Sequence, residues 1–181
     1  MNYLVVVAHP DDEALGCAAT IHKLIKEGNE VAIVTMANHA AARANISDTL
    51  VEDQKKAFEI MGVTKSYAAD FPNIKMNTVP HLDLVQFIER CIEDFGAEAI
   101  ITHHPSDTND DHAVTSHAVQ AAVRIAQRKE GLPSLKLVLF MEIMSSTEWS
   151  FDPSLVIILH KDATYLPFVK FPLSTAYLIY L

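Results

Sequence analysis

The sequence predicts an α/β fold of three layers, in which a mostly parallel, Rossmann-like sheet carries helices on both faces. Two observations support this prediction. Short apolar runs of strand length alternate with longer segments whose apolar residues recur at helical spacing. The first three segments, residues 3–8, 15–27 and 31–36, follow the order strand, helix, strand. That order predicts a right-handed parallel crossover.

Each element is expected from its own local pattern. Residues 3–8 form a β-branched apolar run, which is typical of a buried parallel strand. Gly28 and Gly62 follow helical patterns and are expected to end those helices. The remaining patterns predict helices over about 49–61, 82–95 and 113–128, strands over 66–69, 99–102 and 135–143, and loops over 37–48 and 70–79.

Length and composition favour one globular domain over residues 1–181. The chain has 181 residues and no obvious internal repeat, and half of its residues are hydrophobic. Its last segment, 155–181, is atypical because it is apolar and aromatic without a clean helical period. This segment either covers the core or forms a subunit interface in a homo-oligomer, and the sequence leaves both alternatives open.

The charge of the chain narrows the class of partners. A formal net charge of −9 argues against non-specific binding of nucleic acid and against a polybasic membrane anchor. No apolar run approaches the ~20 residues that span a bilayer, and the N-terminus lacks a signal-peptide pattern. Two distant cysteines, Cys17 and Cys91, suggest buried thiols in a reducing compartment. We therefore expect a cytoplasmic enzyme.

The most informative motif is Ala-His-Pro-Asp-Asp-Glu at residues 8–13, directly after an apolar run at residues 4–7. It places one imidazole and three carboxylates at the carboxyl end of the first strand. Open α/β sheets bind their ligands outside this end of the strands. Unpaired buried carboxylates are costly, so the motif needs a counter-charge, and a divalent metal ion is the obvious candidate.

A second motif, His-His-Pro-Ser-Asp-Thr-Asn-Asp-Asp-His at residues 103–112, follows the strand predicted over 99–102. Taken alone, the first motif could be a hydrogen-bonded turn, and residues 109–111 could simply cap the next helix. Their expected convergence on one sheet edge favours a shared site. Two histidines and one aspartate suit catalytic Zn²⁺ with an open position for water, and the same set could hold Fe²⁺.

These two motifs resemble those of the PIG-L/LmbE-like zinc-dependent de-N-acetylases, and the resemblance covers roughly residues 1–152. Residues 8–13, the pair Asp111-His112 and the segment 145–149 carry it. The resemblance implies that His9, Asp12 and His112 bind zinc and that Asp11 is the general base. Zinc-activated water would then attack the amide of an N-acetylglucosamine-type sugar or sugar conjugate.

The sequence departs from this family at the position of its proton donor. The best-known members carry a histidine three residues before the last zinc ligand, where this chain has Asn109. An amide can donate a hydrogen bond to an oxyanion but cannot transfer a proton. His103 or His104 could substitute, or Asp11 could return its own proton. Asp107 and Asp111 are expected as supporting carboxylates that orient such a histidine.

Three further features bear on function. Glu13 either hydrogen-bonds the metal loop or favours the start of the following helix. Arg43 is the candidate substrate-binding arginine after the second strand, with a solvated loop arginine as the alternative. Residues 155–181 do not match the family pattern and are expected to be truncated or divergent.

The divergence of residues 155–181 and the presence of Asn109 favour a rival interpretation, a non-catalytic metal- or sugar-binding relative. A nucleotide-binding protein is a weaker interpretation because the first turn lacks glycines.

Overall fold

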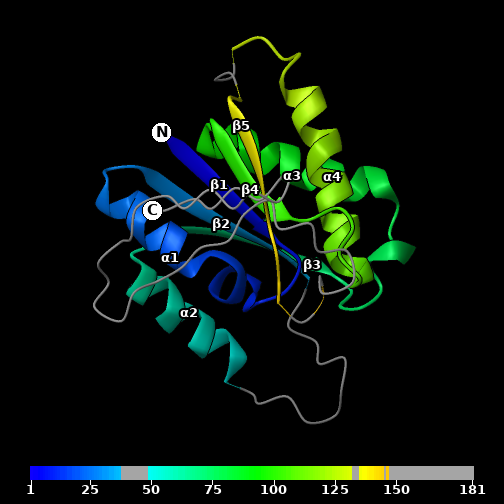
Figure 1. Cartoon of the computed structure of the whole chain (residues 1–181). Helices are drawn as coiled ribbons and strands as arrows, with labels where there is room; N and C mark the ends of the chain where they lie inside the picture. The colour runs from blue at the N-terminus through cyan, green and yellow to red at the C-terminus, as the bar shows by residue number, and fades with distance from the viewer. Residues whose placement is uncertain (38–48, 132–134, 145, 147–181) are drawn as a thin grey trace, which may run out of the picture.

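In the part of the chain that the structure describes, five parallel strands form one sheet with helices on both of its faces (Figure 1). The computed structural model describes residues 1–37, 49–131, 135–144 and 146. The strands are β1 (Asn2–Val7), β2 (Glu30–Ala37), β3 (Lys65–Phe71), β4 (Ala99–His103) and β5 (Leu137–Met141). The helices are α1 (Asp12–Lys26), α2 (Leu50–Met61), α3 (His81–Phe95) and α4 (Asp110–Ala126), with a 3₁₀ turn, η1 (Met76–Thr78). The strand order is β3-β2-β1-β4-β5, with every neighbouring pair parallel.

The central strand β1 shows why the sheet is covered on both faces. Its successive side chains point to opposite faces, and all four residues from Leu4 to Val7 are fully buried. Leu4 and Val6 pack with residues of α3 and α4, whereas Val5 and Val7 pack with residues of α1 and α2. Figure 1 shows the same division of the helices. The predicted three-layer, mostly parallel fold is therefore confirmed.

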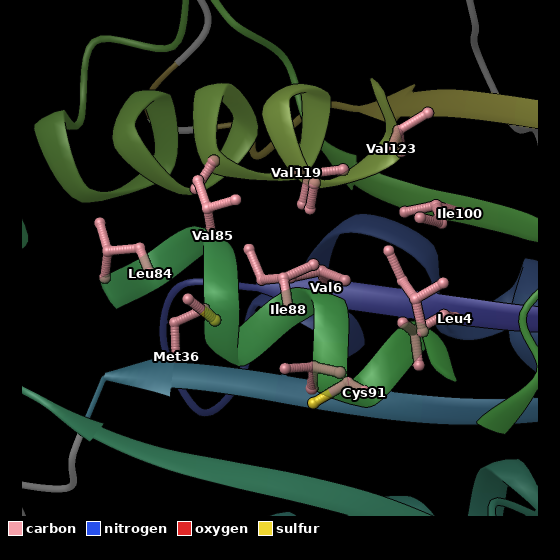
Figure 2. Close-up of a cluster of buried hydrophobic side chains, with 14 of the residues drawn as sticks. Leu4, Val6, Met36, Leu84, Val85, Ile88, Cys91, Ile100, Val119 and Val123 are labelled. Carbon is pink, nitrogen blue, oxygen red and sulfur yellow. The ribbon is translucent and has the colours of Figure 1, made fainter. Parts of the chain in front are cut away.

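The core beneath α3 and α4 determines the position of the first turn of α4, where the second motif ends. Figure 2 shows side chains of both helices gathered against residues of β1, β2 and β4, among them Leu84, Val85, Ile88, Cys91, Val119 and Val123. The small residues Ala118 and Ala122 are also fully buried in this core. Burial of this apolar stripe along α4 holds its first turn at the carboxyl edge of β1 and β4.

The two helices that follow the motifs begin three residues earlier than the apolar periodicity predicts. α1 starts at Asp12 and α4 starts at Asp110. Periodicity misses the first turn because that turn carries carboxylates, which the helix dipole stabilises. The predicted loop over 70–79 is partly wrong, since β3 extends to Phe71 and η1 follows it. Gly62 ends α2 in the left-handed conformation, as predicted.

Several predictions fall on residues outside the described ranges. These are the loop 38–48 with Arg43, the apolar segment 155–181, and the segment 145–149 apart from Ser146. Within the ranges that are described, no helix combines the length and the apolar character that crossing a membrane requires.

Candidate metal centre and active site

Both motifs lie at the point where the strand order reverses. From β1 the chain passes through α1 to β2 on one side, and from β4 it passes through α4 to β5 on the other. The loops after two such neighbouring strands diverge and leave a crevice, where open α/β sheets bind ligands. His9 follows β1 and His103 ends β4, so the two motifs flank this crevice.

Three of the predicted residues meet there as a compact group. The Nδ1 atom of His9 lies 3.2 Å from Nε2 of His112. The two carboxylate oxygens of Asp12 lie 3.4 Å from these same nitrogens, one oxygen to each. Four ligands at the usual zinc distance of about 2.0–2.1 Å stand about 3.3–3.4 Å apart at tetrahedral corners. The two imidazole nitrogens have this spacing, and one donor atom from each of the three residues lies within 4.8 Å of the others. The group can therefore hold one metal ion through three ligands, with a fourth position left for another ligand.

Two outer carboxylates fix the orientation of the two imidazoles. Asp111 Oδ2 lies 3.1 Å from Nε2 of His9, and Asp107 Oδ2 lies 2.9 Å from Nδ1 of His112. Each contact engages the outward nitrogen, so the other nitrogen of each ring faces the group. The sequence predicts that Asp107 and Asp111 orient His103 or His104. The structure instead pairs them with His112 and His9.

Asp107 is itself held in place by three donors. Its oxygens accept hydrogen bonds from His112, from the Asn109 N–H and from the Ser146 hydroxyl. The residue is buried, and burial alone would raise the pKa of its carboxyl group, but these hydrogen bonds hold the pKa below its usual value. Asp107 therefore stays ionised beside the imidazole that it orients.

The electrostatics of the group favour added positive charge. Burial by itself lowers the pKa of His9, but Asp111 and Asp12 outweigh it and raise the pKa to about 9. Burial likewise lowers the pKa of His112, and Asp107 and Asp12 raise it to about 9. Burial would raise the pKa of Asp12, yet the surrounding imidazoles hold it well below its usual range. A divalent cation supplies the positive charge that these carboxylates stabilise.

Asp11 stands at the N-terminus of α1 in a strained backbone conformation. Its φ of 128° is positive, which is unusual for a residue other than glycine. Although the residue is exposed, partial burial of its carboxyl group and then the negative charge of Asp12 raise its pKa. An exposed carboxylate with a raised pKa, next to the candidate ligand Asp12, is suited to accept a proton.

Glu13 stabilises this strained turn through a hydrogen bond. Its side chain is fully buried, and one of its oxygens accepts a hydrogen bond from the Asp11 N–H at 3.2 Å. Burial raises the pKa of the Glu13 carboxyl group. Of the two roles considered for Glu13, the hydrogen bond to the metal loop is present, and the residue also lies in the first turn of α1.

The two neighbouring histidines of the second motif differ in their surroundings. His103 is fully buried, and its Nε2 accepts the Ala8 N–H at 2.9 Å and lies 3.2 Å from Asp12. Its ring stacks on His112 with centroids 4.0 Å apart, and burial lowers its pKa. His104 is half-buried, and its Nδ1 accepts the Ser106 N–H at 3.1 Å. Within the described ranges, no hydrogen bond joins His104 to His9, Asp12 or His112.

Asn109 occupies the N-cap of α4. Its side-chain oxygen accepts the Asp111 N–H at 3.0 Å, which is the usual contact of a capping asparagine. The capping alternative from the sequence is therefore present in the structure. The nitrogen of the same amide keeps its capacity to donate a hydrogen bond.

Sequence reasoning missed the contacts that hold Asp111. The N–H groups of Ile74 and Met76 donate to its two oxygens at 2.6 and 3.0 Å. Both residues lie in the segment predicted as a plain loop, about 35 residues before Asp111. No local pattern signals such a contact, because backbone N–H groups are common to every residue type and the pairing depends on the tertiary fold.

The fold and the donor set define an α/β protein with a candidate metal centre at the point where the strand order of its sheet reverses. A model of the GlcNAc-PI de-N-acetylase (PIG-L) family matches residues 4–123. Because this match covers well over half of the sequence, the chain belongs to that family.

The chain is also similar to other known proteins, and the solved structures among them share its fold. The chain is 27% identical over 126 residues to the uncharacterized deacetylase YaiS of Escherichia coli K12, a match that covers 67% of each chain. Among solved structures it is similar to the conserved protein TT1542 of Thermus thermophilus, with a TM-score of 0.72 and 21% identity over 84% of this chain and 69% of that one. It is also similar to the N,N'-diacetylchitobiose deacetylase of Pyrococcus horikoshii, with a TM-score of 0.66 and 18% identity over 77% and 60% of the two chains.

The fold alone does not define the reaction. GalB, a 4-carboxy-2-hydroxymuconate hydratase from Pseudomonas putida KT2440, is also similar to this chain, with a TM-score of 0.58 and 22% identity over 76% of this chain and 61% of that one. The reaction must therefore be argued from the site and from the family.

Proposed function

We propose that this protein is a zinc-dependent hydrolase that removes the N-acetyl group from an N-acetylglucosamine-type sugar or sugar conjugate. One observation carries the proposal: Nδ1 of His9 and Nε2 of His112 lie 3.2 Å apart, and each lies 3.4 Å from one of the two carboxylate oxygens of Asp12. One donor atom from each residue therefore lies within 4.8 Å of the others, which suits a catalytic zinc site with one open corner. Membership of the de-N-acetylase family supports the choice of an acetylated amine as substrate.

In this proposal each residue of the site has a separate task. His9, Asp12 and His112 hold the metal ion, and Asp107 and Asp111 orient the two imidazoles. Bound zinc lowers the pKa of water to about 7 and polarises a carbonyl group. The same donors also suit Fe²⁺, so zinc is the first of two metals to test.

Asp11 takes the proton from the attacking water. Its raised pKa makes it a better base near neutrality than an ordinary aspartate. The C–O bond to the acetyl carbon forms, the C–N bond breaks, and the products are acetate and a free amine. The amine needs one proton as it leaves, and Asp11 holds the one it took from water. We therefore assign the return of that proton to Asp11.

His103 receives a different task in this scheme. A fully buried ring whose pKa is lowered by burial is a poor source of protons. Its Nε2 already accepts the Ala8 N–H, so the ring connects the β1 backbone to Asp12 and His112. We propose that His103 positions these two ligands.

Asn109 offers an amide N–H to the developing oxyanion, and Arg43 remains the candidate arginine that binds the substrate.

Acetate release tests the proposal. The protein is stripped of metal, reloaded with one equivalent of Zn²⁺ or Fe²⁺, and incubated with N-acetylglucosamine and simple glycosides of it. Metal-dependent release of acetate is the expected result. Stoichiometric metal binding without release from any of these substrates would instead favour the non-catalytic binding protein. Absence of metal binding would contradict the assignment of His9, Asp12 and His112.

A further inference from the structure

We propose that Ile74 contacts the substrate and selects N-acetylated amino sugars that carry an apolar aglycone, such as an alkyl or aryl group. This inference rests on the proposed deacetylase function and adds the chemistry of the group attached to the sugar. Three observations carry it: the position of Ile74 beside the candidate metal centre, its strained backbone, and its exposed side chain.

A hydrogen bond to one oxygen of Asp111 connects the backbone of Ile74 to the candidate site. Its N–H donates to Asp111 Oδ2 at 2.6 Å, and the same oxygen lies 3.1 Å from Nε2 of His9. The second oxygen of Asp111 accepts the Met76 N–H at 3.0 Å. The carboxylate of Asp111 therefore fixes residues 74–76, which lead into η1, next to the candidate metal ligand His9.

Ile74 is an unfavourable residue for the conformation it adopts. Its φ of 57° lies in the left-handed region, where a β-branched side chain is strained and glycine is not. Ile74 is 56% exposed, so burial of its apolar surface compensates for only part of this strain. Strained residues that persist tend to cluster at ligand-binding sites. An apolar ligand placed on this side chain would supply the burial that the protein itself does not.

Two other exposed apolar side chains come from segments that are tied to the same site. Leu15 is 64% exposed, and its N–H donates to the carbonyl of Asp11 at 2.9 Å. Met144 is 85% exposed and lies two residues before Ser146, whose hydroxyl donates to Asp107. Leu15, Ile74 and Met144 are thus exposed apolar residues on three separate segments that either supply residues of the site or contact it. A free amino sugar offers little apolar surface to them, whereas an alkyl or aryl aglycone does.

The experiment compares hexyl and methyl N-acetyl-β-glucosaminide as substrates of the zinc-loaded protein. We expect the wild type to prefer the hexyl glycoside in kcat/KM, and Ile74→Gly to reduce that preference about tenfold, mainly through KM. The melting temperature of Ile74→Gly should be equal to or higher than that of the wild type, because glycine relieves the positive φ. The matched control is Ile60→Ala, which removes another exposed isoleucine from α2 and should leave the preference unchanged.

Each alternative result has a defined meaning. An unchanged preference in Ile74→Gly would overturn the inference. So would a clear fall in its melting temperature, since that would show that the side chain packs within the protein. Calorimetric binding of hexyl β-glucosaminide, which has no acetyl group to lose, should weaken about tenfold in Ile74→Gly. Failure to release acetate from either substrate would contradict the proposed function, while this binding measurement would still decide the role of Ile74.

Discussion

Two neighbouring groups of side chains offer three metal-ligating residues each, and they share His112. The first is His9, Asp12 and His112, and the second is His103, Asp107 and His112. By residue type and spacing alone, both qualify as metal sites. They differ in burial, because all three members of the second group are buried, whereas His9 keeps part of its surface open.

They differ more in which donor atoms are still available. In the first group the outward nitrogens of His9 and His112 are engaged by carboxylates, so the facing nitrogens are left for a metal. In the second group Nε2 of His103 accepts the Ala8 N–H, and Nδ1 of His112 is paired with Asp107. Hydrogen bonds in the protein thus already use Nε2 of His103, Nδ1 of His112 and the carboxylate of Asp107. A metal site is therefore defined by free, oriented lone pairs rather than by residue types.

A pair of matched glutamine variants should separate the two groups most strongly. His9→Gln removes the facing Nδ1 and should lose stoichiometric zinc and acetate release together. His103→Gln can still accept the Ala8 N–H through its side-chain oxygen and should retain one equivalent of zinc. Metal content after dialysis, measured by atomic emission, checks both variants. Retention of zinc by His9→Gln and its loss from His103→Gln would reverse the assignment.

Substitution of Asp11 should separate binding of the metal from catalysis. In Asp11→Asn we expect kcat for acetate release to fall by about 10²–10⁴-fold, because a proton acceptor is removed. Zinc content should stay at one equivalent, because Asp11 is not among the three donors. Steady-state kinetics with metal analysis on the same samples provides the check. Activity near the wild-type level would show that another group acts as the base.

The outer carboxylates should produce a smaller and graded effect. Asp107→Asn and Asp111→Asn should each weaken zinc affinity by about 10–100-fold, since the imidazoles lose the partners that orient them. Only Asp111→Asn should also loosen the segment around Ile74, because only Asp111 accepts its N–H. Competition with a zinc chelator measures affinity, and hydrogen exchange at residues 74–76 reports the loosening. Equal exchange in both variants would argue against this division of roles.

The pH dependence of stability should be the smallest effect and the most diagnostic of the metal-free state. The pKa values of His9 and His112 are raised from 6.5 to about 9 in the folded chain. Their contribution to stability is therefore fully present below about pH 6.5 and is lost as the pH rises to about 9. Urea denaturation of the metal-free protein should show this decline, and zinc should remove it by replacing the protons. Stability that instead rises across this interval in the metal-free protein would be inconsistent with the assigned contacts.

The sequence contains enough information to predict the fold and the location of the site. Alternating strand and helix patterns predict the parallel sheet, and the motifs after β1 and β4 predict the sheet edge at which side chains gather. The starts of α1 and α4 are missed because the first turn of each helix is polar. That error matters, since Asp12 and His112 are held on rigid first turns rather than on loops.

The pairing of histidines with carboxylates could not be predicted from the sequence. Asp107 and Asp111 each stand close to several histidines along the chain, and only the geometry of the α4 N-terminus decides that they contact His112 and His9. The burial that distinguishes His103 from His104 depends in the same way on the packing around β4. The positive φ of Ile74 has no signal in its residue type, which disfavours that conformation.

The central claim is that one particular set of three donors holds the metal. A crystal structure of the zinc-loaded protein, with anomalous scattering recorded on both sides of the zinc edge, tests this claim most directly. We predict one strong anomalous peak bounded by Nδ1 of His9, the Asp12 carboxylate and Nε2 of His112. A peak among His103, Asp107 and His112, or no peak in this crevice, would contradict the account.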